Sequence, residues 1–278
     1  MSPPEIHVFQ HNAMATQFQV RIADQEKKYA AQAAQAAFAL LDHLESLLSR
    51  FNANSEIVQI AGLSPGETLR LSEPVFACLA AAQKMEAASS GAFSITAAAL
   101  KTQKAKPQWS LLPAAFSIRC DAGKLEFDLG AIGKGFALDR QAEIMREWDC
   151  PAFLLVAGGS SILAGASPAG ALGWSCGLGE NNSSDRFWLT QCSLSGSGLA
   201  VKGSHILDPR TGAPPRRTER TWALANTATE SDALSTAAMV QEETEIQAMV
   251  AACTDWLIIR QEQPEPKYFG SRVRPEKV

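Results

Sequence analysis

The chain has 278 residues, of which 46% are hydrophobic and 19% are charged, and its 25 Lys and Arg against 29 Asp and Glu give a formal net charge of −4. The apolar content is sufficient for a packed core and excludes a disordered chain. The weakly acidic balance argues against a nucleic-acid-binding protein, because neutralising phosphates requires clustered Lys and Arg. The length allows one large domain or two small ones.

The cysteines and the N-terminal segment point to a reducing compartment. None of the six cysteines forms a C-x-x-C pair, and a chain of this length does not need disulfide bonds to fold. The first twenty residues lack the basic and apolar regions of a secretory signal and have no lipid-accepting cysteine. No apolar run reaches the roughly 18 residues of a membrane-spanning helix. We therefore expect a cytoplasmic protein without a membrane anchor.

The first half of the chain predicts a hairpin and two helices. Residues 8–22 alternate loosely between apolar and polar, which indicates a strand or hairpin, and residues 26–49 have the Ala- and Leu-rich spacing of a helix. A second helix is expected over 74–89, ended by Ser90 and Gly91. Residues 101–113 contain Lys, Gln and two Pro and are predicted to be a loop, and residues 124–129 a short strand.

The second half alternates irregularly between helices and strands. A glycine-rich turn leads into a helix that ends near Trp148, followed by a buried strand over 153–156. Further elements are predicted in this order: strands near Trp174, at 187–189 and at 205–207, a helix over 231–240 and a strand over 256–259. The lack of a regular βαβ alternation favours an α+β fold over a Rossmann fold. We expect a single domain over residues 1–260 and a loose, Pro-containing tail over 261–278.

The glycine-rich turn reads DLGAIGKGFALD from Asp128 to Asp139. At the start of a helix, free backbone N–H groups and the helix dipole form a natural phosphate site. Lys134 would add positive charge beside the phosphates. The spacing is not that of a Walker loop. The alternative is an ordinary helix start whose glycines serve only packing.

The segment TESDALST, from Thr229 to Thr236, contains a candidate metal site. Asp232 and Thr236 are four residues apart and share one helix face. A carboxylate and a hydroxyl are oxygen ligands that suit a hard cation such as Mg²⁺, which needs only one or two carboxylates from the protein. The alternative is a helix N-terminus capped by Ser231.

The segment HILDPRTG, from His205 to Gly212, combines a turn with a histidine. Asp208 and Thr211 suit the turn that Asp-Pro and Thr-Gly indicate. His205 comes just before this turn and could face a pocket. A lone histidine is more often structural than catalytic, so a purely structural turn is the alternative.

Together and in this order, the three segments resemble the FAD:protein FMN transferase family, the ApbE-like proteins. Weaker similarities at Met14-Ala15-Thr16, Ser49-Arg50-Phe51 and Gly91-Ala92-Phe93-Ser94 extend the resemblance from Met14 to about Ala237. It implies an α+β fold with mixed sheets, flanking helices and a cleft for flavin and metal. It also implies an enzyme that uses FAD and Mg²⁺ to transfer FMN to a Thr or Ser hydroxyl of a target flavoprotein, releasing AMP.

The resemblance also implies roles for individual residues. The implied metal ligands are the Ala131 backbone carbonyl, Asp232 and Thr236, with Ser235 nearby. The implied FAD contacts are Met14, Phe51, Ala92, Phe93, Ser94, Asp128, Lys134, His205 and Ile206. His205 and Asp208 are candidates for activating or positioning the acceptor hydroxyl.

The sequence departs from the family pattern at several pocket positions. Ser94, Ser160, Ser161 and Ser197 stand where the family often has an acidic or aromatic side chain, Ala61 stands in place of Asn, and the stretch 96–128 is short. These departures leave the metal and phosphate positions intact and alter the flavin and acceptor sides. The alternative functions are therefore an FAD-binding protein without efficient transfer and an FAD pyrophosphatase that splits FAD to FMN and AMP.

The sequence leaves the acceptor protein unidentified. Arg216, Arg217 and Arg220 form a basic cluster that could meet an acidic acceptor or form a solvated surface loop.

Overall fold

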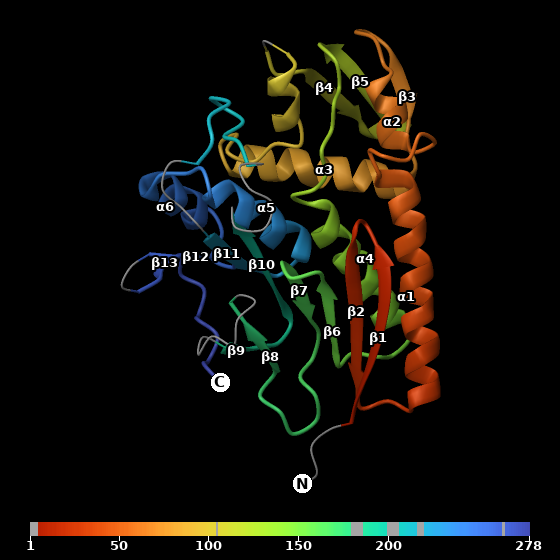
Figure 1. Cartoon of the computed structure of the whole chain (residues 1–278), viewed down its shortest axis with the longest axis vertical. Coiled ribbons are helices and arrows are strands. Elements are labelled where there is room, and N and C mark those ends of the chain that lie inside the picture. Colours follow the sequence, from red (N-terminus) through yellow and green to blue (C-terminus); the bar gives the residue numbers. More distant parts are fainter. Residues whose placement is uncertain (1–4, 104, 179–185, 199–205, 216–219, 263–264) are drawn as a thin grey trace.

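An eight-stranded antiparallel sheet forms the centre of the computed structural model, which describes residues 5–103, 105–178, 186–198, 206–215, 220–262 and 265–278 (Figure 1). The strands lie in the order β1-β2-β6-β7-β10-β11-β12-β13. Their bounds are β1 Ile6–Ala13, β2 Thr16–Ala23, β6 Phe153–Ala157, β7 Ser161–Ala164, β10 Cys192–Gly198, β11 Arg220–Ala225, β12 Leu257–Arg260 and β13 Lys267–Phe269.

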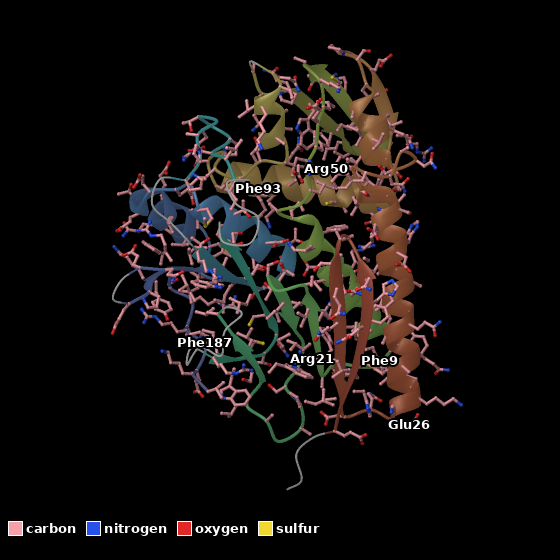
Figure 2. The ribbon with its side chains drawn as sticks, viewed as in Figure 1. Phe9, Arg21, Glu26, Arg50, Phe93 and Phe187 are labelled. Atoms are coloured by element: carbon pink, nitrogen blue, oxygen red, sulfur yellow. The ribbon has the colours of Figure 1, made fainter. Side chains whose placement is uncertain are left out.

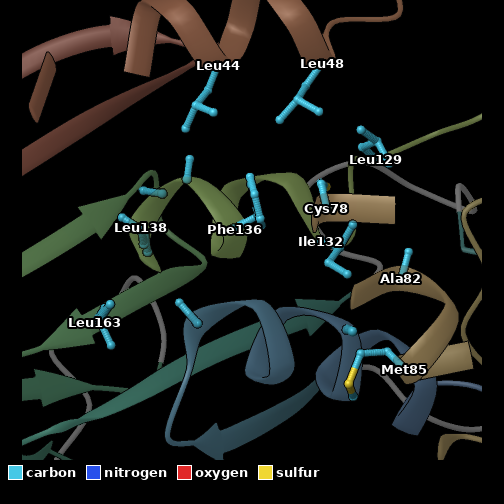
Figure 3. Packing of buried hydrophobic residues seen from close by; sticks show 14 of the residues in the cluster. Leu44, Leu48, Cys78, Ala82, Met85, Leu129, Ile132, Phe136, Leu138 and Leu163 are labelled. Atoms are coloured by element: carbon cyan, nitrogen blue, oxygen red, sulfur yellow. The ribbon is translucent and has the colours of Figure 1, made fainter. Parts of the chain in front are cut away.

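Helices pack against one face of this sheet and form the main core. Their bounds are α1 Lys27–Leu48, α3 Glu73–Ala88, α4 Gly133–Glu147, α5 Ala228–Ala238 and α6 Glu243–Ala251. Figure 3 shows Leu44 and Leu48 of α1 facing Phe136 and Leu138 of α4, with Met85 of α3 nearby. Alternate strand residues point into this core because side chains alternate between the faces of a sheet. No helix within the described ranges is both long and apolar enough to span a bilayer.

The opposite face of the sheet is covered by a short hairpin. Strands β8 (Trp174–Gly177) and β9 (Arg186–Leu189) pair with each other in a separate two-stranded sheet. Trp174 and Phe187 from this hairpin pack with Leu154, Leu194 and other outward residues of the large sheet in a second buried cluster. The large sheet is therefore apolar on both faces.

A smaller antiparallel sheet occupies the opposite end of the molecule from the chain termini (Figure 1). Its order is β3-β5-β4, and α3 lies across the molecule between it and the large sheet. Its elements and those next to it are α2 Glu56–Ala61, β3 Thr68–Arg70, β4 Gln108–Leu112 and β5 Ser117–Ala122, with short 3₁₀ turns at Ala97–Lys101 and Pro113–Ala115.

The α+β class is confirmed, as are the opening hairpin, the first two long helices, and α4, β6, β8, β9, α5 and β12 within a few residues. The predictions for the smaller sheet were wrong. Residues 124–129 do not form the expected strand, and the strand in this region is β5, which ends at Ala122. Gly123, with φ +76°, follows β5 and turns the chain away from its pairing partners. Leu125 and Phe127 are buried without strand pairing, so their alternation reflects burial rather than a strand. The loop expected at 101–113 contains β4, which pairs with β5.

Sequence reasoning also missed α2 and the docking of the C-terminal tail. Ser55 caps α2 by accepting a hydrogen bond from the Val58 N–H at 3.1 Å. The tail expected to be loose contributes β13, which pairs with β12, and Val278 donates its N–H to the Arg186 carbonyl at 2.9 Å. The tail packs against the rest of the protein because the Phe269 ring is buried in the main core.

Candidate functional site

The glycine-rich turn enters α4 through a fixed backbone. The N–H of Asp128 donates to the Ile95 carbonyl at 2.8 Å, and the Asp128 carboxylate accepts the Gly130 N–H at 2.9 Å. The same carboxylate lies 3.1 Å from the Arg50 guanidinium. The Arg50 guanidinium in turn lies over the Phe51 ring, 4.8 Å from its centroid. Asp128 therefore joins the turn to the end of α1.

The first turn of α4 is bound to α5 through Asp232. The Gly135 N–H donates to Asp232 Oδ2 at 3.1 Å. Gly135 is the third residue of α4, so its N–H is one of the first-turn donors that have no acceptor within the helix. The Lys134 ammonium lies 3.7 Å from Asp232 Oδ1. The helix start thus supplies an N–H and a positive charge to one carboxylate, and Ala131 lies in the turn just before this start.

Asp232 is a buried carboxylate with compensating partners. Its residue surface is only 3% exposed, and its Oδ1 accepts a hydrogen bond from the Ser161 hydroxyl at 2.9 Å. Burying a carboxylate is unfavourable unless hydrogen bonds or opposite charge replace its water. Here an N–H and a nearby ammonium from the start of α4 and a hydroxyl from β7 do so. Asp232 therefore connects α5 with α4 and β7.

Ser235 and Thr236 lie beside Asp232 on α5. The Ser197 hydroxyl on β10 is 2.9 Å from Ser235 Oγ and 3.0 Å from Thr236 Oγ1. Both α5 hydroxyls also donate to the backbone carbonyl of Asp232, at 3.0 and 3.3 Å respectively. The structure thus brings the expected ligands Asp232, Ser235 and Thr236 together next to the start of α4.

This set of donors suits a hard cation better than a soft one. The carboxylate, the two hydroxyls and the backbone carbonyl present only oxygen, which Mg²⁺ and Ca²⁺ prefer. No group of three or more His, Cys, Asp and Glu that could hold a metal occurs in the part of the chain that the structure describes. Five described cysteines are buried, and the sixth, Cys253, is half-buried. The residues present therefore fit Mg²⁺ with few protein ligands.

The expected flavin contacts differ in how accessible their side chains are. Ala92 and Phe93 are buried in the main core, so a ligand would meet their backbone rather than their side chains. Phe51 is 83% exposed, with the Arg50 guanidinium over its ring. Figure 2 places Arg50 and Phe93 toward the same end of the molecule, away from Phe187.

Two further expected contacts lie in well-defined turns. Met14 is in the β1–β2 turn at φ +50°, and its N–H donates to Glu45 of α1 at 2.8 Å. The Ser94 hydroxyl, at the position of the expected acidic side chain, donates to Glu86 of α3 at 3.0 Å. Glu86 also forms an ion pair with Lys106. A carboxylate is therefore present beside Ser94, supplied by α3.

The Asp208 carboxylate is engaged within its own turn. It accepts hydrogen bonds from the Arg210 backbone N–H and from Nε and Nη2 of the Arg210 side chain, each at 2.9 Å. Arg210 also pairs with Glu245 of α6. Burial acts to raise the pKa of Asp208, but the Arg210 hydrogen bonds outweigh it and hold the pKa below its ordinary value. Asp208 therefore makes a poor base.

The other residues of this segment are placed only in part. His205 lies outside the described residues, as do Arg216 and Arg217. Ile206 is buried, and residues 206 and 207 do not form the predicted strand. The proton-accepting role of His205 or Asp208 stays a prediction.

Asp139 is a structural carboxylate that the sequence analysis did not single out. From α4 it accepts the backbone N–H groups of Ala228 and Thr229, at 2.7 and 2.8 Å, together with the Thr229 hydroxyl. It thereby satisfies free donors at the start of α5. Burial raises the pKa of Asp139 and outweighs these hydrogen bonds, which act to lower it. The one feature of the sequence that could have indicated this role is the position of Asp139 at the end of the motif DLGAIGKGFALD, inside the predicted helix.

Comparison with known proteins gives a consistent result. The model of the ApbE family matches residues 14–257. A Klebsiella pneumoniae protein named FAD:protein FMN transferase is 24% identical over 216 residues, which is 65% of this chain and 66% of that protein. An Escherichia coli K12 protein of the same name is 27% identical over 134 residues, which is 43% of this chain and 38% of that protein. The matches thus span less than two thirds of these relatives.

Solved structures agree over nearly the whole chain. The flavin transferase ApbE from Vibrio cholerae has a TM-score of 0.81 at 19% identity, covering 97% of this chain and 98% of that one. The apo flavinyl transferase ApbE from Pseudomonas stutzeri has a TM-score of 0.80 at 19% identity, covering 96% of each chain. At this identity the likeness establishes the fold. With the family model spanning most of its length, the chain belongs to the ApbE family.

Proposed function

We propose that this protein transfers the FMN moiety of FAD to a Thr or Ser hydroxyl of a target flavoprotein and releases AMP. The observation that carries the proposal is the buried Asp232 carboxylate, held between Ser161 and the first turn of α4 with Lys134 beside it. A buried carboxylate suited to a cation, next to a helix start suited to phosphate, supports the proposal. Membership of a family whose named relatives are FAD:protein FMN transferases supports the same activity.

The reaction breaks the phosphoanhydride bond of FAD and forms a phosphoester bond to the acceptor. The acceptor hydroxyl oxygen forms a bond to the phosphorus of the FMN half, and the bond from that phosphorus to the bridging oxygen breaks. AMP leaves with the bridging oxygen and its electron pair, and the hydroxyl proton passes to a base or to solvent. Phosphoryl transfer of this kind depends mainly on positioning and on electrostatic stabilisation.

The chain supplies both requirements at the start of α4. Backbone N–H groups of the glycine-rich turn would bind the pyrophosphate, and Lys134 would offset the charge that develops on the leaving AMP. Asp232, Thr236 and the Ala131 carbonyl would hold Mg²⁺, with Ser235 nearby. When bound, Mg²⁺ would supply positive charge to the pyrophosphate oxygens. His205 is the remaining candidate for accepting the hydroxyl proton, because Asp208 is engaged by Arg210.

The flavin would lie toward the other expected contacts. Exposed Phe51 offers a ring for stacking, and the backbone near Ala92 and Phe93, Ser94, Met14 and Ile206 would define the edges of the site. Asp128 would hold the turn through Arg50. The partner is a flavin-accepting protein of unknown identity.

Intact-mass spectrometry tests the proposal directly. The protein is incubated with FAD, Mg²⁺ and a flavoprotein acceptor domain, and AMP is followed in the same tube. An acceptor mass gain equal to the FMN moiety with stoichiometric AMP, both lost in EDTA, is the expected result. AMP release without modification of the acceptor would identify an FAD pyrophosphatase, and bound FAD with neither product would identify an FAD-binding protein.

Replacing Asp232 by Ala should lower Mg²⁺-dependent turnover by about a hundredfold or more, because several kcal/mol of charge stabilisation are lost. Asp232→Asn preserves the shape and removes the charge, so it separates loss of metal binding from loss of folding. Glu147→Ala, at an exposed position on α4, is the matched control. Full activity in a folded Asp232→Asn variant would overturn the metal assignment.

A further inference from the structure

A ladder of serines on β10 contacts α5 at regular intervals. The Ser193 hydroxyl donates to the Thr227 carbonyl at 2.6 Å, Ser195 Oγ lies 2.8 Å from Ser231 Oγ, and Ser197 Oγ lies 2.9 Å from Ser235 Oγ. Each step of two residues on the strand thus corresponds to a step of four on the helix. Two strand residues advance about 6.6 Å and four helical residues about 6 Å, so the two repeats nearly match.

The last rung of this serine ladder differs from the others. Ser195 is fully buried and contacts one hydroxyl, that of Ser231. Ser197 is half-buried and contacts two hydroxyls, those of Ser235 and Thr236. These two residues are neighbours of Asp232 on the face that meets the start of α4. Ser197 is therefore the rung that borders the candidate metal site.

The three hydroxyls at this rung form a connected network with the Asp232 backbone carbonyl. Ser235 and Thr236 donate their protons to the backbone carbonyl of Asp232. Ser197 has one proton and two lone pairs, and in each of its two contacts either oxygen can be the donor. Thr236 then keeps a lone pair available for a cation. Ser197 restricts the rotation of both side chains by contacting them from β10.

From this geometry we propose that Ser197 is a positioning residue that orients the Thr236 hydroxyl toward a cation held by Asp232. The inference rests on the proposed metal site and assigns a role to a position where the resemblance predicted a lost pocket group. Residues that orient metal ligands typically alter metal affinity by roughly 10- to 100-fold when removed.

A titration of the whole protein with Mn²⁺, monitored by electron paramagnetic resonance, tests the inference. The titration is done once with saturating FAD and once without FAD, and the acceptor is absent in both. Ser197→Ala should weaken Mn²⁺ binding roughly tenfold, and Ser197→Thr, which keeps a hydroxyl, should restore most of it. Ser195→Ala is the matched control: it removes the preceding rung, and Ser231 keeps its hydrogen bond to the Ala228 carbonyl. The control should lower Tm without changing Mn²⁺ affinity.

The turnover assay adds a second readout. In Ser197→Ala, the Mg²⁺ concentration at half-maximal rate should rise while the rate at saturating Mg²⁺ falls by less than about threefold. Unchanged Mn²⁺ affinity in a folded Ser197→Ala variant would overturn the inference, as would equal effects in Ser195→Ala. A wild-type protein that binds no Mn²⁺ would also overturn it.

The two proposals can fail separately. If the wild-type protein binds Mn²⁺ but transfers no FMN, and Ser197→Ala weakens that binding, the positioning role stands and the transferase proposal fails. If transfer occurs with unchanged Mn²⁺ affinity in Ser197→Ala, the transferase proposal stands and the positioning role fails.

Discussion

The Lys134 ammonium lies at the first turn of α4, 3.7 Å from the nearest oxygen of Asp232, with its side chain 20% exposed. Its position lets it reach a bound phosphate while remaining near the carboxylate. We predict that Lys134→Ala weakens FAD binding by roughly tenfold, since hydrogen bonds to charged groups contribute about 1.5–3 kcal/mol. Flavin fluorescence titration measures the affinity.

Lys27→Ala provides the comparison for Lys134→Ala, because Lys27 is an exposed lysine at the start of α1. Its FAD affinity should equal that of the wild-type protein. An unchanged affinity in Lys134→Ala would remove this residue from the phosphate site.

Single residues of the site were predictable where chemistry follows local spacing. The four-residue spacing of Asp232 and Thr236 identified a shared helix face, and Lys134 stood at a glycine-rich helix start. The partners of these residues were not predictable in the same way. Ser161 and Ser197 lie on β7 and β10, and no local pattern indicates which side chain of α5 each of them contacts. Arg50 and Arg210 were likewise read as parts of motifs, while their ion pairs depend on the fold.

At the scale of elements, the contact between α4 and α5 depends on Gly135. A Cβ atom at this position would lie 2.1 Å from the Ala228 carbonyl oxygen, which is backbone and cannot turn aside. We predict that Gly135→Ala destabilises the protein by about 2 kcal/mol or more and displaces the N–H that binds Asp232. Urea unfolding monitored by circular dichroism gives the free energy of unfolding.

Gly133→Ala on the same helix is the matched control. Its Cβ would lie 3.5 Å from Leu129 Cβ, which is an ordinary contact. Replacing a helical glycine by alanine there should leave stability within about 1 kcal/mol of the wild type, or raise it. Equal stability of the two variants would show that α4 and α5 separate more easily than the structure indicates.

Elements with strong periodicity were predicted, and elements determined by tertiary pairing were not. The 22 residues of α1 show a long helical pattern, and Leu41, Leu44 and Leu48 form its buried face. Strands β4 and β5 are short and have no comparable pattern. In β4 the reason is that it is an edge strand whose residues are mostly half-buried. The buried Leu125 and Phe127 imitate a strand pattern without a pairing partner. Burial alternation alone therefore does not distinguish a strand from an extended segment packed on a core.

At the scale of the whole molecule, the C-terminal segment completes the large sheet. Phe269 on β13 is 4% exposed and belongs to the main core, and the Arg260 guanidinium lies 5.3 Å from its ring centroid. We predict that Phe269→Ala destabilises the protein by about 3–5 kcal/mol, as expected for removal of a buried aromatic ring. Val273→Ala, at an 87% exposed position in the same segment, should change stability by less than about 0.5 kcal/mol.

Chemical denaturation of both variants checks this difference. A small effect of Phe269→Ala, close to that of Val273→Ala, would mean that the tail does not contribute to the core. The tail was misjudged from its prolines, which do not indicate that Phe269 packs in the main core and Tyr268 against the second cluster.

The serine ladder between β10 and α5 sets two repeats of slightly different length side by side. From one serine to the next, the strand advances slightly further than the four helical residues beside it. From Ser193 to Ser197 the strand therefore gains about 1 Å on the helix, which is most of the rise of one helical residue. This gain brings the third serine level with the gap between two successive helix positions, where it meets both Ser235 and Thr236. The mismatch between two regular repeats thus creates one irregular contact, and it does so beside Asp232.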